Sequence, residues 1–175
     1  MRKLIFKIVF TLIPTFFFGQ TVFDKYDGQE EVTSVIVNKK MFQLMGSVKM
    51  DLKDKEAQQY LDLIKKLDNL KVFTTESQKT TADMKATTEK YIKSAGLEEL
   101  MRVNEAGKSI KILVKSGAKD TQIKELLMFI ESANKSTETV LMSLTGDFDL
   151  AEIAILTDKM KIPGGDVLKK ASKKH

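Results

Sequence analysis

Three carboxylates near the end of the chain have the spacing best suited to chemistry. Asp147 and Asp149 follow Gly146 and precede Glu152, where a predicted strand gives way to a predicted helix. Ligands of α/β proteins commonly bind at such strand ends, and paired carboxylates in a cleft can act as general acid and base. A structural interpretation, which we favour, is that Asp149 caps the helix and Glu152 reaches back to the Asp149 N–H as a capping box.

The chain lacks the residues on which most other reaction centres depend. Its one histidine is the terminal His175, and it has no cysteine. Thiol catalysis and thiolate metal sites are therefore excluded, and a zinc site would need carboxylates alone, which zinc seldom uses. Neither the GxxxxGK nor the GxGxxG phosphate-binding pattern is present. We therefore predict no catalytic, cofactor-binding or metal-binding residues, no cofactor, and a protein that is not an enzyme.

The methionines are the one unusual feature of the composition. Eight of the nine lie beyond the initiator and are spread over nearly every predicted element: Met41, Met45, Met50, Met84, Met101, Met128, Met142 and Met160. Methionine can line a pliable apolar groove or bind copper(I). Because these residues form no Met-x-Met cluster, we favour ordinary core packing. A groove lined by methionine and phenylalanine remains the basis of an alternative function, a carrier for a hydrophobic small molecule.

Residues 1–20 have the pattern of a secretory signal peptide. Arg2 and Lys3 precede an apolar run over residues 8–18, and this first segment has no acidic residue. The run of 11 residues is short against the roughly 20 that a membrane-spanning helix needs. We expect cleavage after Gly19 or Gln20, with an uncleaved anchor as the alternative. The protein is then exported, in the periplasm or outside the cell, without a transmembrane span.

The charge of the chain argues against nucleic-acid binding. The formal charge is +5, from 29 basic and 24 acidic residues. Loss of Arg2, Lys3 and Lys7 with the signal peptide leaves 26 basic residues and a charge of +2. The signs are evenly mixed, whereas a nucleic-acid surface needs a clustered basic face. The basic cluster at residues 169–174 is interpreted as a solvated chain end.

Alternating and helical patterns predict one α/β (α+β) domain. Strands are expected at 32–37, 70–75, 98–104, 109–115 and 140–145. Helices are expected after Asn38, from Asp54, over 77–95 with Gly96 as C-cap, from Asp120, from Asp149 and over 166–171. Their apolar stripes include Met41, Leu44, Met45 and Val48 after Asn38, and Ile123, Leu126, Leu127, Ile130 and Ala133 after Asp120.

We therefore predict a single mixed sheet of about five strands with a central antiparallel hairpin, covered by amphipathic helices. In this organisation residues 1–20 are the signal peptide, 21–31 a polar, solvated leader, and 32–172 one compact domain. The acidic segment DKYDGQEE within the leader does not place its oxygens as an EF-hand loop requires.

Several stretches together resemble the Bacteroidota family called domain of unknown function 4252. They are FDKY (23–26), VTSVIVNKKMFQLM (32–45), LKVFTTE (70–76), LEELMRV (97–103), SLTGDFDLAEIAILTDKM (143–160) and PGGDVLKK (163–170). The resemblance implies a small exported envelope protein without an assigned activity, and it transfers no functional residues. Many members are lipoproteins, but this chain has no cysteine to carry a lipid.

From these observations we expect an exported, non-enzymatic envelope protein that acts as a protein-interaction or regulatory module. Its partner would be another envelope protein.

Overall fold

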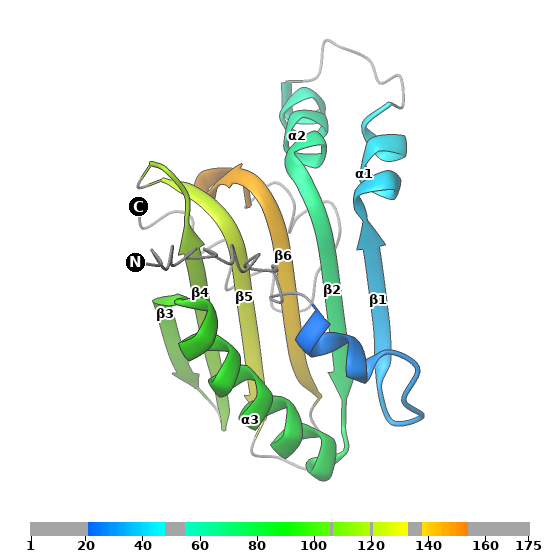
Figure 1. Ribbon diagram of the computed structural model, residues 1–175, viewed down its shortest axis with the longest axis vertical. Coiled ribbons are helices and arrows are strands. Elements are labelled where there is room, and N and C mark those ends of the chain that lie inside the picture. The colour runs from blue at the N-terminus through cyan, green and yellow to red at the C-terminus, as the bar shows by residue number, and fades with distance from the viewer. Residues whose placement is uncertain (1–20, 48–54, 106, 120, 133–137, 154–175) are drawn as a thin grey trace, which may run out of the picture.

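A computed structural model describes residues 21–47, 55–105, 107–119, 121–132 and 138–153. In chain order the elements are η1 (Thr21–Tyr26), β1 (Thr33–Asn38), α1 (Lys39–Gly46), α2 (Lys55–Lys66), β2 (Leu67–Thr75), α3 (Gln78–Ala95), β3 (Glu98–Glu105), β4 (Lys108–Ser116), β5 (Gln122–Ser132), β6 (Thr139–Asp149) and η2 (Leu150–Glu152). The strands form one sheet in the order β1-β2-β6-β5-β4-β3, with every neighbouring pair antiparallel (Figure 1).

The predicted α/β (α+β) fold class is confirmed, because helices pack against a single β-sheet. The sheet has six strands in place of about five, and its pairing is antiparallel throughout in place of mixed. The predicted hairpin is present as β3 and β4, but it forms one edge of the sheet and not its centre.

The additional strand is β5, which replaces the helix expected after Asp120, and that prediction was wrong. Apolar residues at 123, 126, 127 and 130 fit a helical stripe, but the run from Leu126 to Ile130 is buried at every position. A strand covered on both faces carries a continuous apolar run, which periodicity alone does not distinguish from a buried helix. Asp120 itself lies outside the described residues.

The two faces of the sheet hold two separate apolar clusters. On the face that we call the α1/α2 face, strand residues such as Val72, Met128 and Met142 pack with Phe42 of α1 and Ile64 of α2. The opposite face, which we call the α3 face, lies under η1 and α3 (Figure 1). There the buried strand residues Phe73, Leu113, Leu127, Phe129 and Leu141 pack with Phe23, Tyr26, Met84, Tyr91 and Leu97.

The leader expected to be solvated is in fact part of the α3 face. Phe23 and Tyr26 of η1 are 1% and 0% exposed. Their rings pack edge-on against Tyr91 and Phe73, with centroids 5.0 Å and 5.8 Å apart respectively. Burial of two aromatic rings outweighs the acidic composition of the segment, because each ring removes a large apolar area from water.

Local signals for the ends of elements are confirmed where the structure describes them. The side chain of Asn38 accepts a hydrogen bond from the Met41 N–H at 3.0 Å and begins α1. Gly96 is the C-cap of α3. Gly107, in the turn between β3 and β4, has φ of +78°, a backbone conformation that favours glycine.

Several predictions fall outside the described residues: the signal peptide, Asp54, the basic chain end at residues 169–174 and the helix at 166–171. None of the described helices has the length and apolar character needed to cross a membrane.

Candidate functional site

Asp149 and Glu152, at the end of β6, have the structural roles that we favoured. The Asp149 side chain accepts a hydrogen bond from the Ala151 N–H at 3.0 Å, and Glu152 accepts one from the Asp149 N–H at 2.9 Å. The predicted capping box at the start of η2 is complete, because the Asp149 side chain also accepts from the backbone N–H of Glu152. Phe148 and Ile153, at the positions of a hydrophobic staple, are both buried in the cluster of the α1/α2 face.

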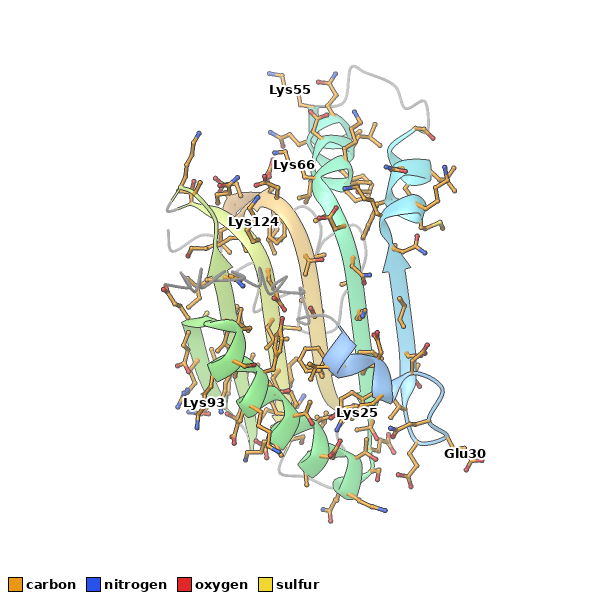
Figure 2. The ribbon with its side chains drawn as sticks, in the orientation of Figure 1. Lys25, Glu30, Lys55, Lys66, Lys93 and Lys124 are labelled. Carbon is orange, nitrogen blue, oxygen red and sulfur yellow. The ribbon has the colours of Figure 1, made fainter. Side chains whose placement is uncertain are left out.

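Basic side chains form ion pairs with two of the three carboxylates, Asp147 and Glu152. Asp147 is exposed and pairs with Lys124 at 2.8 Å, and it also accepts a hydrogen bond from Gln122. The bond from Lys124, with a smaller contribution from Gln122, lowers the pKa of Asp147. Lys66 pairs with Glu152 at 2.6 Å, and Figure 2 shows Lys66 and Lys124 at this end of the sheet. The lowered pKa favours the ionised form of Asp147, which makes this side chain poorly suited to donate a proton.

The predicted strand was expected to end at residue 145, but β6 continues past Gly146 through Asp149. Gly146 serves a different purpose here. A Cβ atom added at this position would lie 2.4 Å from the carbonyl oxygen of Lys66. At this point α2 passes directly into β2, and the pairing with β6 has a bulge between Leu67 and Asn69. Glycine is required because two backbones approach closely, and not because the chain reverses.

A second polar group, which we call the Glu125 cluster, was not predicted. It consists of Tyr91 of α3, Glu125 of β5 and Ser143 of β6. The Tyr91 hydroxyl donates to both Glu125 oxygens, at 2.9 Å and 2.8 Å, and the Ser143 hydroxyl lies 3.4 Å from one of them. Glu125 is only 6% exposed. The cluster thus joins three elements that are far apart in the sequence.

Burial dominates the electrostatics of the Glu125 cluster. It raises the pKa of Glu125, although hydrogen bonds from Tyr91 and Ser143 and the charge of Lys115 partly oppose this. Burial also raises the pKa of Tyr91, and the nearby charge and hydrogen bond of Glu125 raise it further. Tyr91 therefore stays protonated and acts as the donor. The buried Glu125 carboxylate accepts hydrogen bonds from Tyr91 of α3 and Ser143 of β6. It is therefore suited to anchoring α3 on the sheet.

Further polar residues surround this cluster on the α3 face. Strand register places Thr145 opposite both Glu125 and Asn69, and Lys71 opposite Ser143. Lys71 is buried and pairs with Asp24 of η1. Within the described ranges, the Asn69 Oδ1 and Thr88 Oγ1 atoms are buried without a hydrogen-bond partner. The described part of the chain holds no group of three or more acidic, histidine or cysteine side chains that could bind a metal.

Four large apolar side chains are exposed on β1 and α1, at the edge of the sheet and on both of its faces, and we call them together the β1–α1 surface. Val35 and Ile36 are 51% and 42% exposed, and Met41 and Leu44 are 51% and 54% exposed. The prediction that α1 buries a face containing Met41 and Leu44 was wrong. The short helix instead buries Phe42, and Met45 packs against the same cluster. In a helix of eight residues, either stripe satisfies the spacing rule, and only the tertiary packing selects between them.

The methionines mostly fill the interior. Met84, Met128 and Met142 are each 0% exposed, and Met45 and Met101 pack against the α1/α2 cluster. Core packing is therefore confirmed for these residues, while Met50 and Met160 lie outside the described ranges. This leaves few described methionines for the lining of a carrier groove.

Comparison with known proteins gives a family but no activity. No curated protein and no solved structure matches the chain significantly. A family model described as "Domain of unknown function (DUF4252)" matches residues 26–156, which include every strand of the sheet and the Glu125 cluster. The chain belongs to this DUF4252 family.

Proposed function

We propose that the protein is an exported, non-enzymatic module that binds another protein chain, in an interaction or regulatory role at the cell envelope. The observation that carries this proposal is the β1–α1 surface, where four large apolar side chains are between 42% and 54% exposed. Large exposed apolar side chains on two consecutive elements favour an interaction site over singly scattered surface residues.

The sheet edge beside these side chains supports the same function. β1 is the outermost strand in the sheet order, and its sequence, TSVIVN, has no charged residue. One side of an edge strand offers unpaired N–H and C=O groups, which another strand can pair with. Binding by strand addition uses these backbone groups for affinity and the side chains for specificity.

The opposite edge is protected in the way that proteins commonly protect edges. β3 carries Glu98, Glu99, Arg102 and Glu105, and its pairing with β4 is interrupted by a bulge between Glu99 and Met101. Charges and bulges discourage the addition of another strand. The contrast favours β1, and not β3, as the binding edge.

Export rests on residues 1–20, whose basic start and short apolar run are typical of a signal peptide. The absence of cysteine is compatible with an oxidising compartment but is not specific to it. Localisation is tested by comparing the N-terminal sequence of the protein recovered from the periplasm or medium with that of the cytoplasmic precursor. Recovery of only an uncleaved cytoplasmic chain would contradict export.

Site-specific photo-crosslinking in the producing cells tests the binding surface. A photoreactive amino acid replaces Val35 on β1 or, as the matched control, the exposed Asn104 on β3. We expect protein adducts from position 35, identified by mass spectrometry, and few from position 104. Equal labelling from both positions, or none from position 35, would contradict the proposal.

A further inference from the structure

We infer that the partner of β1 is a second copy of this chain, which pairs β1 with β1 in the antiparallel direction around a two-fold axis. This inference rests on the proposed function and specifies the partner at the same surface. It derives from the distribution of charge on both sides of β1.

The charges on either side of β1 are complementary to those of a second copy whose β1 runs in the opposite direction. Glu30 and Glu31 precede the uncharged strand, and Lys39 and Lys40 follow it. If Val35 of one copy lies opposite Val35 of the other, then the segment before β1 in one copy, with Glu30 and Glu31, lies at the same end of the paired strands as Lys39 and Lys40 at the start of α1 in the other. Acidic and basic ends then meet at both ends of the paired strands. A parallel arrangement would place like charges side by side, which is unfavourable.

This register also aligns the two faces of the sheet. Val35 lies opposite Val72 and so projects on the α1/α2 face, whereas Ile36 lies opposite Lys71 and projects on the α3 face. Directly opposed residues of antiparallel strands project on the same face. Pairing Val35 with Val35, and Ser34 with Ile36, keeps equivalent faces on the same side. The two sheets then form one continuous sheet with β3 at both outer edges.

The outer members of the charged set are available for such contacts. Glu30 and Lys40 are exposed, and among the described residues neither has an ion-pair partner. Figure 2 shows Glu30 projecting from the body of the protein beside β1. The inner members already have local contacts, since Lys39 pairs with Asp68 at 2.7 Å and Glu31 accepts a hydrogen bond from Thr80 at 3.2 Å. Glu30 and Lys40 are therefore the pair to test.

The other edge does not have this self-complementarity. Antiparallel pairing of β3 with itself about its midpoint would place Glu98 opposite Glu105 and Glu99 opposite Asn104. Acidic residues would then face one another at both ends. Charge thus favours a dimer through β1 and disfavours further growth through β3, so the assembly closes at two copies.

A charge-reversal cycle tests the dimer, with the protein purified from the cells that produce it. Sedimentation is measured for the unchanged protein, Lys40→Glu, Glu30→Lys and the double variant. Each single variant creates two repulsive contacts per dimer and is expected to raise the Kd about tenfold, as befits exposed pairs of modest strength. The double variant restores both pairs and should return the Kd to near its starting value. Singles without effect, or a double variant weaker than both, would overturn the inference.

A single introduced cysteine tests the register independently. The chain has no cysteine of its own, so Val35→Cys can form a disulfide only between copies. Opposed residues on antiparallel strands have Cα atoms about 4.5 to 5.5 Å apart, which lies within the range for a disulfide. We expect covalent dimers from Val35→Cys under mild oxidation and none from the control Asn104→Cys. A folded Val35→Cys variant that forms no disulfide between copies would overturn the register.

The two proposals fail in different ways. A protein that stays monomeric up to about 1 mM overturns the second-copy inference. In that case adducts from position 35 to a different protein would still support the proposed function. Adducts only to the same chain would support both proposals together.

Discussion

On the α1/α2 face the strands bury only apolar side chains, whereas on the α3 face they also bury Lys71, Glu125 and Ser143. The difference extends to α3 itself, which buries Thr80 and Thr88 together with Met84 and Tyr91. Both faces belong to the same six-stranded sheet. One face of the sheet is thus covered by apolar contacts, and the other by apolar contacts together with buried polar groups.

The comparison separates stability from specificity. Apolar contacts on the α1/α2 face are non-directional and stabilise in proportion to the area buried. Hydrogen bonds on the α3 face contribute less net free energy, but an unpaired buried polar group is costly. The Glu125 cluster thus disfavours other placements of α3, because they would leave the carboxylate unpaired. Because Glu125 lies on the α3 face, this face should contribute a pH dependence to the free energy of unfolding.

Truncation of adjacent leucines on β5 should give the largest effects and separate the two faces. Leu126 and Leu127 are both 0% exposed and project on opposite faces. Leu126→Ala is expected to lower the free energy of unfolding by about 3 to 5 kcal/mol. Leu127→Ala should cost less, because Leu127 neighbours Ser143, and a cavity with polar partners can hold water. Urea denaturation measures both, and a larger loss for Leu127→Ala would contradict the comparison.

Removal of the Tyr91 hydroxyl should be the next largest effect. Tyr91→Phe leaves Glu125 buried with Ser143 as its remaining hydrogen-bond donor in the cluster. Loss of hydrogen bonds to a charged group is expected to cost about 2 kcal/mol at pH 7. The cost should shrink at low pH, where the carboxyl group is protonated. The control is Tyr26→Phe, whose hydroxyl donates to the exposed Asp83 at 2.8 Å. An equal loss in both variants would contradict a special role for burial.

Substitution of Glu125 should remove a pH dependence of stability. Because burial raises its pKa above the ordinary value of 4.5, the folded state holds this proton to a higher pH than the unfolded state. The stabilisation that comes from this raised pKa is therefore complete when the pH is below 4.5, and it is lost as the pH rises through the pKa of Glu125 in the folded state. Glu125→Gln should flatten this decline and raise stability at pH 7 by about 1 kcal/mol.

The control for this prediction is Glu131→Gln, which removes a carboxylate that pairs with Lys85 on the same face. It should not remove the decline. Denaturation curves between pH 4 and 8 measure the slope in each variant. A slope that survives in Glu125→Gln would assign the pH dependence to other groups.

Local signals in the sequence predicted much of this fold. The Asn38 cap, the helix ending at Gly96, the β3–β4 hairpin and the Asp149 capping box each depend on residues close in the chain. Such signals work because hydrogen bonds near element ends involve neighbours. β5 was not predicted because burial on both faces erased its alternation.

The Glu125 cluster and the β1–α1 surface required information that is not local. The Tyr91 and Glu125 hydrogen bond spans 34 positions, and the expected helix had left Glu125 outside its apolar stripe. Exposure of Val35 depends on strand order, since an apolar β-branched strand can be central or at an edge. A sequence alone does not fix that order.

The smallest expected effect concerns one hydroxyl on the α3 face. Thr88 is 2% exposed, and within the described part of the chain its Oγ1 atom has no hydrogen-bond partner. Thr88→Val replaces this hydroxyl by a methyl group of similar size and should raise the free energy of unfolding by about 1 kcal/mol. Thr80→Val is the matched control on the same helix, because the Thr80 hydroxyl donates to Glu31 at 3.2 Å. It should lower stability by about the same amount. If both valine variants shifted thermal or urea midpoints in the same direction, hydrogen bonding would not be what distinguishes these threonines, and the polar character of the α3 face would need a different physical basis.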